Sequence, residues 1–128
     1  MARVIEEADR LGRRDISDEL EAFLIKLLDT VVQYRTDDGR FHDILDDPGS
    51  FIDGTSAMMM AATIYRGIKH GYISGTYRDY ADRAVDTVSA KIDAYGLIRE
   101  VSGCPDFISE GTSAEAQAAY IMAVSWRH

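Results

Sequence analysis

Apolar residues follow two alternating patterns along the chain. In the first pattern, one apolar face recurs at helical spacing among charged residues, which predicts amphipathic helices over residues 2–12, about 18–35 and about 76–93. In the second pattern, small and apolar residues follow one another almost without charge, which predicts buried helices over about 56–70 and about 113–126. The chain therefore predicts an all-α fold of about five helices.

The two connections before the uncharged helices are long and rich in Asp and Gly. They cover residues 36–54 and 94–112, and loops of this length in a compact domain are usually functional. Residues 41–45 in the first loop could form a short strand after a tight turn. Helix caps are expected from Asp15 or Ser17, from Thr55 or Ser56, and from a capping box over Thr112-Ser-Ala-Glu115.

Both patterns recur because the sequence contains a repeat. Gly54-Thr-Ser-Ala57 returns as Gly111-Thr-Ser-Ala114, an offset of 57 residues, and Asp29-Thr-Val31 returns as Asp86-Thr-Val88 at the same offset. We predict one domain over 1–128, with repeat units at about 18–71 and 76–126. Six such units would make about 342 residues, the size of a complete (α/α)6 toroid. We therefore expect part of such a toroid, with amphipathic helices outside, small-residue helices inside and the long loops at one mouth.

Composition and charge narrow the classes of partner. The net charge of −8 and the pI of about 4.7 argue against nucleic acid and anionic membranes, which call for a basic face. The single cysteine, Cys104, allows no internal disulfide and fits a reducing compartment, and residues 1–14 lack the apolar core of a secretory signal. We expect a cytoplasmic protein. No residue spacing indicates a metal site, and we expect no cofactor.

Four motifs in order resemble the C-terminal part of glycoside hydrolase families 88 and 105, the unsaturated glucuronyl and unsaturated rhamnogalacturonyl hydrolases. The motifs are Asp38-Gly-Arg-Phe-His-Asp-Ile-Leu-Asp-Asp-Pro48, Ser50-Phe-Ile-Asp-Gly-Thr-Ser-Ala57, Tyr95-Gly-Leu97 and Gly111-Thr-Ser-Ala-Glu-Ala-Gln117. The resemblance covers roughly residues 20–125. It implies a six-hairpin (α/α) barrel, in agreement with the repeat.

The resemblance also implies a reaction. These enzymes remove a terminal 4,5-unsaturated uronic acid from an oligosaccharide by protonating and hydrating its vinyl ether, with an aspartate as general acid and base. In the family this aspartate and an Arg-Gly-x-Gly-Trp segment lie on earlier hairpins, and this sequence contains neither motif. We therefore expect a C-terminal fragment that is inactive alone, and the sequence assigns no catalytic residue.

Six residues near the predicted mouth are candidates for binding an unsaturated oligosaccharide: His42, Asp53, Thr55, Ser56, Thr112 and Ser113. Each also has a structural interpretation. Asp53 and the four hydroxyl residues precede or begin inner helices, where they could equally cap helix N–H groups. His42 could bind a sugar or be a solvated turn residue.

Two hypotheses of different classes remain open. The first is a fragment of a glycoside hydrolase that contributes loops to an active site completed elsewhere. The second is a non-catalytic helical-repeat module that binds carbohydrate or protein. In either case the open edges of a partial toroid favour a homo-oligomer or association with the missing N-terminal part.

Overall fold

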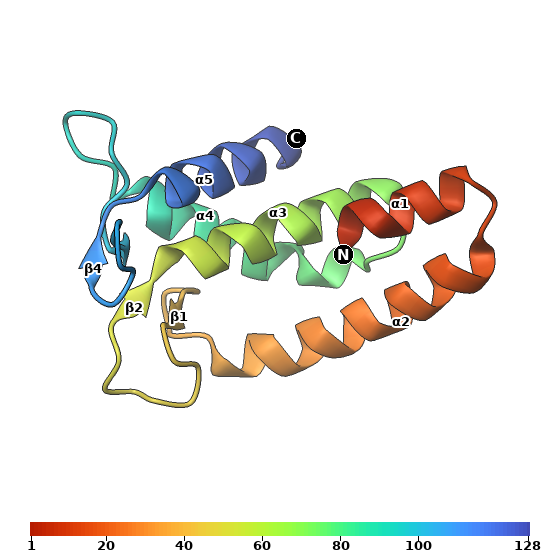
Figure 1. The fold of residues 1–128 in the computed structure, drawn as a ribbon, viewed down its shortest axis with the longest axis horizontal. Coiled ribbons are helices and arrows are strands. Elements are labelled where there is room, and N and C mark those ends of the chain that lie inside the picture. Colours follow the sequence, from red (N-terminus) through yellow and green to blue (C-terminus); the bar gives the residue numbers. More distant parts are fainter.

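Five helices form the frame of the protein, which a computed structural model describes over all residues 1–128. They are α1 (Ala2–Arg10), α2 (Arg14–Val31), α3 (Gly54–His70), α4 (Arg78–Ser89) and α5 (Ala114–Trp126) (Figure 1). Single 3-10 turns, Val32–Tyr34 and Gly75–Tyr77, extend α2 and precede α4. The predicted all-α fold is confirmed.

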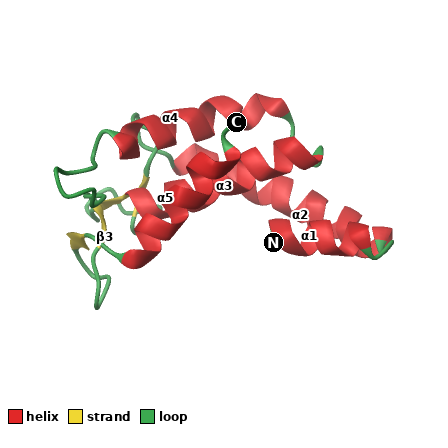
Figure 2. Ribbon diagram, turned by 90° about the horizontal axis from the view of Figure 1, so that it is seen from above, coloured by secondary structure: helices red, strands yellow, loops and turns green.

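Helix α3 is the centre of the packing. It lies against α5 and α4 along much of its length and against α1 near its C-terminal end (Figures 1 and 2). The two small-residue helices α3 and α5 pack against each other, as predicted for the inner layer of a helical toroid, and the amphipathic helix α4 packs against α3. The amphipathic helix α1 packs mainly on α2 and touches the end of α3.

The loops gather at one end of the molecule, beside the starts of α3 and α5 (Figures 1 and 2). Each long loop contains one antiparallel pair of two-residue strands. β1 (Phe41–His42) pairs with β2 (Ile52–Asp53), and β3 (Val101–Ser102) pairs with β4 (Glu110–Gly111). These pairs fix the last residues before each inner helix.

The core consists of apolar side chains from all five helices and from the loop strands. Its largest fully buried members are Tyr65, Phe41, Ile5, Met58, Ile64, Ile98, Val85, Val88 and Val101. α3 is buried on most of its circumference, as predicted. α5 buries only the face of Ala116, Ala119 and Ala123 and leaves Ile121 and Met122 exposed, because no helix covers its other side.

Several predicted boundaries and caps are wrong. α2 begins at Arg14, and Asp15 binds the Arg13 guanidinium at 2.7 and 2.9 Å, so neither Asp15 nor Ser17 caps it. The strand expected over 41–45 stops at His42, because the chain turns at Ile44–Asp47. The amphipathic stripe of α2 is only partly covered, since Phe23 is 59% exposed.

Close packing at the end of α3 depends on Gly67. A Cβ added there would overlap the buried side chain of Ile73. We predict that Gly67→Ala lowers the free energy of unfolding by about 1–3 kcal/mol, despite the better helix propensity of alanine, because overpacking costs more than propensity gains. Urea unfolding measures this. Gly75→Ala is the matched control, because a Cβ at Gly75 meets no atom within 4 Å. Similar losses in both variants would contradict the packing argument.

Candidate functional site

Asp53 occupies the junction between the first loop and α3. Its backbone pairs with Phe41, and its side chain caps α3 by accepting hydrogen bonds from the N–H groups of Thr55 and Ser56, both at 3.0 Å. A third donor comes from the second repeat, where the Ser102 N–H lies 2.9 Å from Oδ1. One carboxylate therefore holds the start of α3 and strand β3 together.

The three donors also control the charge of Asp53. The residue is 6% exposed, and burial by itself raises the pKa of a carboxyl group. The backbone N–H groups of Ser56, Thr55 and Ser102 outweigh burial and hold the pKa of Asp53 below its usual value. Asp53 is thus a fixed anion at the positive end of a helix.

The two copies of the repeated tetrapeptide have different structures. In the first copy Gly54 is the first residue of α3, and Asp53 is the cap. In the second copy the helix begins only at Ala114, and the Ser113 hydroxyl is the cap, accepting from the Ala116 N–H at 3.2 Å. The predicted caps at Thr55 or Ser56 are therefore wrong. The capping box is also wrong, because Ala116, not Glu115, occupies the third helical position after the cap.

In the second loop, two backbone segments lie very close together where Gly103 faces Gly111. A Cβ at Gly111 would lie 3.0 Å from the Cα of Gly103, and a Cβ at Gly103 would lie 3.1 Å from the Cα of Gly111. The Gly103 N–H donates to the Ser109 carbonyl at 2.8 Å, and the Cys104 N–H donates to the Thr112 carbonyl at 3.1 Å. Beyond this contact, residues 104–108 form an exposed tip.

A buried arginine ties the two loops together. Arg40, 5% exposed, donates to Asp38 at 2.7 and 3.0 Å and to Glu100 at 2.7 Å. Partial burial opposes ionisation of Asp38, but hydrogen bonds from Arg40 and Thr36 outweigh it and lower the pKa of Asp38 to about 2. The backbone carbonyl of Glu100 accepts a hydrogen bond from the Gly54 N–H at 3.1 Å. By binding Glu100, Arg40 therefore also helps to position Gly54, the residue after Asp53.

A cavity of about 310 Å³ opens at the start of α3 and α5. Its lining comes from both loops and both helix starts: Asp43, Asp53, Thr55, Ser56, Met59, Ser102, Phe107, Ser113 and Glu115. The Thr55 hydroxyl is buried beside the Asp53 carboxylate, whose pKa it helps to lower. Oxygen-bearing side chains thus dominate the cavity, with Met59 and Phe107 as its apolar members.

The cavity brings together four of the six residues predicted from the sequence, Asp53, Thr55, Ser56 and Ser113. His42 and Thr112 do not line it. Nδ1 of His42 lies 2.8 Å from the Ser50 carbonyl oxygen, which can only accept, so Nδ1 carries the proton of this bond. Thr112 precedes the cap of α5 and pairs through its backbone carbonyl with Cys104.

Ser102 and Phe107 were missed by sequence reasoning. Ser102 reaches the cavity because β3 pairs with β4, and Phe107 because its backbone is held in a left-handed conformation, with φ of 59°, by a hydrogen bond to the Gly103 carbonyl. The only sequence signal was that Phe51-Ile52 returns as Phe107-Ile108 after 56 residues and not after the 57 of the rest of the repeat. No three His, Cys, Asp or Glu side chains come together as a metal site, and no helix is long and apolar enough to cross a membrane.

Comparison with known protein families identifies the family of this chain. Residues 1–122 match the family described as Glycosyl Hydrolase Family 88. The chain belongs to glycosyl hydrolase family 88. The resemblance noted from the motifs at the mouth is thereby confirmed. No curated protein matches the family 88 chain.

Solved structures with the same fold are those of possible members of the GH105 family. The structure from Salmonella enterica serovar Paratyphi A has a TM-score of 0.85 and 19% identity over 98% of this family 88 chain. The structure from Klebsiella pneumoniae has a TM-score of 0.80 and 20% identity over 88% of the chain. The chain spans only 35% and 32% of these two proteins, about a third of their length.

The cap at Asp53 gives a pH-dependent prediction. Asp53→Asn should lower the free energy of unfolding by about 1–2 kcal/mol at pH 7, because a neutral amide is a weaker acceptor for three N–H groups. A lowered folded-state pKa stabilises above the unfolded value of about 3.8 and is lost as pH falls through the folded pKa, so the two proteins should converge in acid. Urea unfolding from pH 3 to pH 7 measures this.

The control for this prediction is Glu110→Gln. Glu110 is the repeat counterpart of Asp53, 57 residues later, but it is exposed and its side chain makes no hydrogen bond. Its substitution should leave the unfolding free energy within about 0.5 kcal/mol. A loss from Asp53→Asn that stayed constant down to pH 3 would show that the charge of Asp53 is not what stabilises the junction.

Arg40 gives a second prediction. Arg40→Met should cost about 2 kcal/mol of unfolding free energy, because it leaves Asp38 and Glu100 without their shared donor. The amide protons of residues 100–102 should also exchange faster. Arg99→Met is the control, since the Arg99–Asp93 pair lies at the surface, with the arginine 48% exposed, and surface pairs contribute roughly 0–1 kcal/mol. Equal losses would contradict a special role for Arg40.

Proposed function

We propose that this chain forms one wall of the sugar-binding site of an unsaturated uronyl hydrolase, and that the catalytic aspartate is supplied by another part of the toroid. The observation that carries the proposal is the cavity where the starts of two inner helices and two loops meet in a family 88 chain. The chain's span of about a third of the matching GH105 structures supports its role as one part of a larger site.

The side chains of the cavity suit the hydroxyl groups of a sugar. Asp43 and Glu115 can accept hydrogen bonds from hydroxyls, and the hydroxyl of Ser102 can both donate and accept. Phe107 offers an aromatic surface to the apolar face of a sugar ring. A small number of placed polar groups on an apolar support is the usual composition of a small-molecule site.

The charge of the cavity selects which part of the substrate it contacts. Asp43, Asp53 and Glu115 line it, and no Lys or Arg does. A uronate carboxylate placed there would be repelled by like charges. We therefore propose that the cavity holds the neutral sugar next to the unsaturated uronyl residue.

Asp53 is unsuited to proton transfer. A general acid needs a carboxyl group that still holds its proton near neutral pH. The pKa of Asp53 is shifted in the opposite direction, and its oxygens already accept three N–H groups. We assign Asp53 to holding the cavity in shape, and we propose that the chain alone is inactive.

Incubation of the purified chain with an unsaturated galacturonyl–rhamnose disaccharide tests the activity. We expect no loss of the vinyl-ether absorbance, because the chain supplies binding groups without the acid. The Asp53→Asn variant is prepared and tested in parallel. Turnover of the disaccharide by the unaltered chain would contradict the proposal. Binding is tested separately by titrating rhamnose and galacturonate against amide NMR signals of residues 102, 107 and 113. We expect weak binding of rhamnose, in the millimolar range, and weaker binding of galacturonate.

A non-catalytic module that binds carbohydrate or protein is the second candidate. Exposed apolar side chains on three helices favour it, among them Phe23, Met59 and Ile121 at 59%, 50% and 63% exposure. Association with a second copy or with the remaining part of a toroid would cover such surfaces. This candidate would be favoured if the chain binds rhamnose but no assembly that contains it hydrolyses the disaccharide.

A further inference from the structure

A polar hollow of about 410 Å³ opens where the first repeat meets the second. Its lining contains no apolar residue and consists of Arg35, Thr36, Asp37 and Arg83, and we name it the Arg83 hollow. It shares no residue with the cavity at the mouth. Its volume far exceeds the roughly 30 Å³ that one water molecule fills in the liquid, so it has room for a small organic molecule.

Contacts between the two repeats fix the walls of the Arg83 hollow. The backbone of the first loop lies directly on α4, since a Cβ at Gly39 would lie 3.1 Å from the backbone nitrogen of Ala84 and 3.3 Å from Cγ of Arg83. The Thr87 hydroxyl donates to the Asp38 carbonyl at 2.7 Å. Every wall of the hollow therefore belongs to internal segments of the chain that hold one another in place.

The guanidinium group of Arg35 is held in position on one side of the hollow. It lies 4.7 Å from the ring centroid of Tyr80, and its Nη1 donates to the Val32 carbonyl at 2.6 Å. A guanidinium group has five N–H donors, so most of those of Arg35 still lack an acceptor. A planar group that is already held loses less freedom when it binds a carboxylate.

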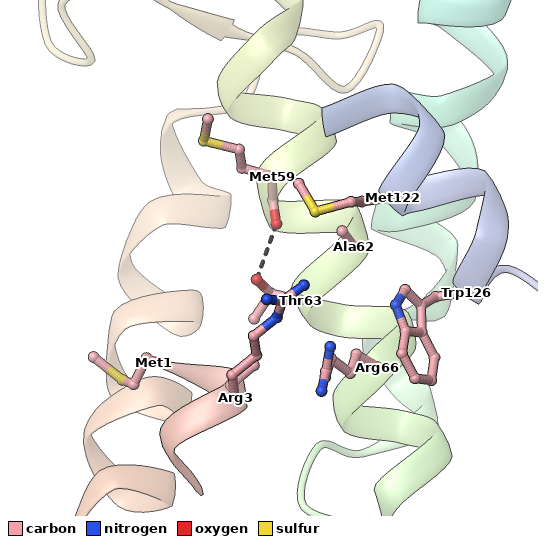
Figure 3. Close-up of a pocket in the computed structure, with 9 residues that line it drawn as sticks. Met1, Arg3, Met59, Ala62, Thr63, Arg66, Met122 and Trp126 are labelled. Atoms are coloured by element: carbon pink, nitrogen blue, oxygen red, sulfur yellow. Dashed lines mark hydrogen bonds between the residues drawn. The ribbon is translucent and has the colours of Figure 1, made fainter. Parts of the chain in front are cut away.

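The two arginines of the hollow have no acidic partner, although the protein carries a net charge of −8. Eight of the 14 Lys and Arg residues pair with a carboxylate, but Arg35 and Arg83 do not. Figure 3 shows the contrasting case of Arg66 in an apolar hollow, where the guanidinium lies 4.8 Å from the Trp126 ring centroid and also pairs with Glu6. The Arg83 hollow thus has two guanidinium groups that are free to bind an anion.

Asp37 distinguishes the Arg83 hollow from a site for a simple anion. Its carboxylate makes no ion pair and lines the hollow with the two arginines. A phosphate ion would be repelled by this carboxylate and has few protons to donate to it. A uronic acid carries one carboxylate, which suits the guanidinium groups, and several hydroxyl groups, which can donate to Asp37.

We propose that the Arg83 hollow is a second carbohydrate site, which binds a uronic acid through its carboxylate. The carboxylate accepts hydrogen bonds from Arg35 and Arg83, and a ring hydroxyl donates to Asp37. The choice of a uronic acid rests on the proposed function, in which the cavity at the mouth repels the same carboxylate. The two sites thus divide the neutral and the acidic sugars of an oligosaccharide between them.

NMR of the arginine Nε–Hε groups of the full chain, titrated with galacturonate, tests the proposal. The signals of Arg35 and Arg83 should shift with an affinity in roughly the millimolar range. The signal of Arg99 should not shift, because Arg99 is paired with Asp93. Galactose, which has the same ring hydroxyls but no carboxylate, should bind at least about fivefold more weakly. Equal binding of galactose would overturn the proposal, and so would tighter binding of inorganic phosphate, which would identify a site for simple anions.

Arginine variants show whether the shifts come from this hollow. Arg83→Gln should weaken galacturonate binding by roughly five- to tenfold, because it removes one of two charged donors. It should leave stability unchanged, since Arg83 is exposed. Arg78→Gln is the matched control, because Arg78 is an exposed arginine of the same helix outside the hollow. The same loss of binding in both variants would contradict the proposal.

This site and the proposed function can fail separately. No response of Arg35 and Arg83 to galacturonate would overturn the second site, whatever happens at the mouth. A response of both arginines to galacturonate would support the second site. If residues 102, 107 and 113 then failed to respond to rhamnose, that result would count against the proposed function of the mouth alone.

Discussion

The structure at the mouth depends on the hydrogen bonds that the buried carboxylate of Asp53 must accept. Taking a charged group out of water costs several kcal/mol unless its oxygens are satisfied. The three N–H donors of Asp53 come from two different repeats, so its oxygens are satisfied only when α3 and β3 are both in place. The cap of one helix is for this reason also the joint between two hairpins.

Arg40 and Gly54 extend this joint from both sides. Arg40 binds the first loop through Asp38 and the second through Glu100, while Gly54 lets the backbone of α3 approach Val88 and Val101. A Cβ at Gly54 would lie 3.1 Å from Val88. The cavity walls are therefore set by backbone positions that several contacts determine together, which is the preorganisation that ligand binding requires.

Much of the fold was readable from the sequence because it rests on local periodicity. The five helices, the inner and outer layers and the gathering of loops at one end follow from the apolar pattern and the repeat of 57 residues. The caps were not readable, because identical Gly-Thr-Ser-Ala segments follow Asp53 in one copy and Glu110 in the other. Only the shorter acid caps a helix, and the second helix starts later. The places of Ser102 and Phe107 were hidden for a similar reason, since strand pairing and a left-handed residue decide them.

The contact between Gly103 and Gly111 divides the second loop into two parts with different freedom to change. A side chain at Gly103 or Gly111 would push these two segments apart, next to the Ser102 N–H that binds Asp53. On the far side, residues 104–108 form an exposed tip, which reaches the cavity through Phe107. The glycine pair thus separates the joint at Asp53 from the tip at residues 104–108. A change of residue in the tip would therefore alter the cavity wall at Phe107 and leave the joint between the hairpins in place.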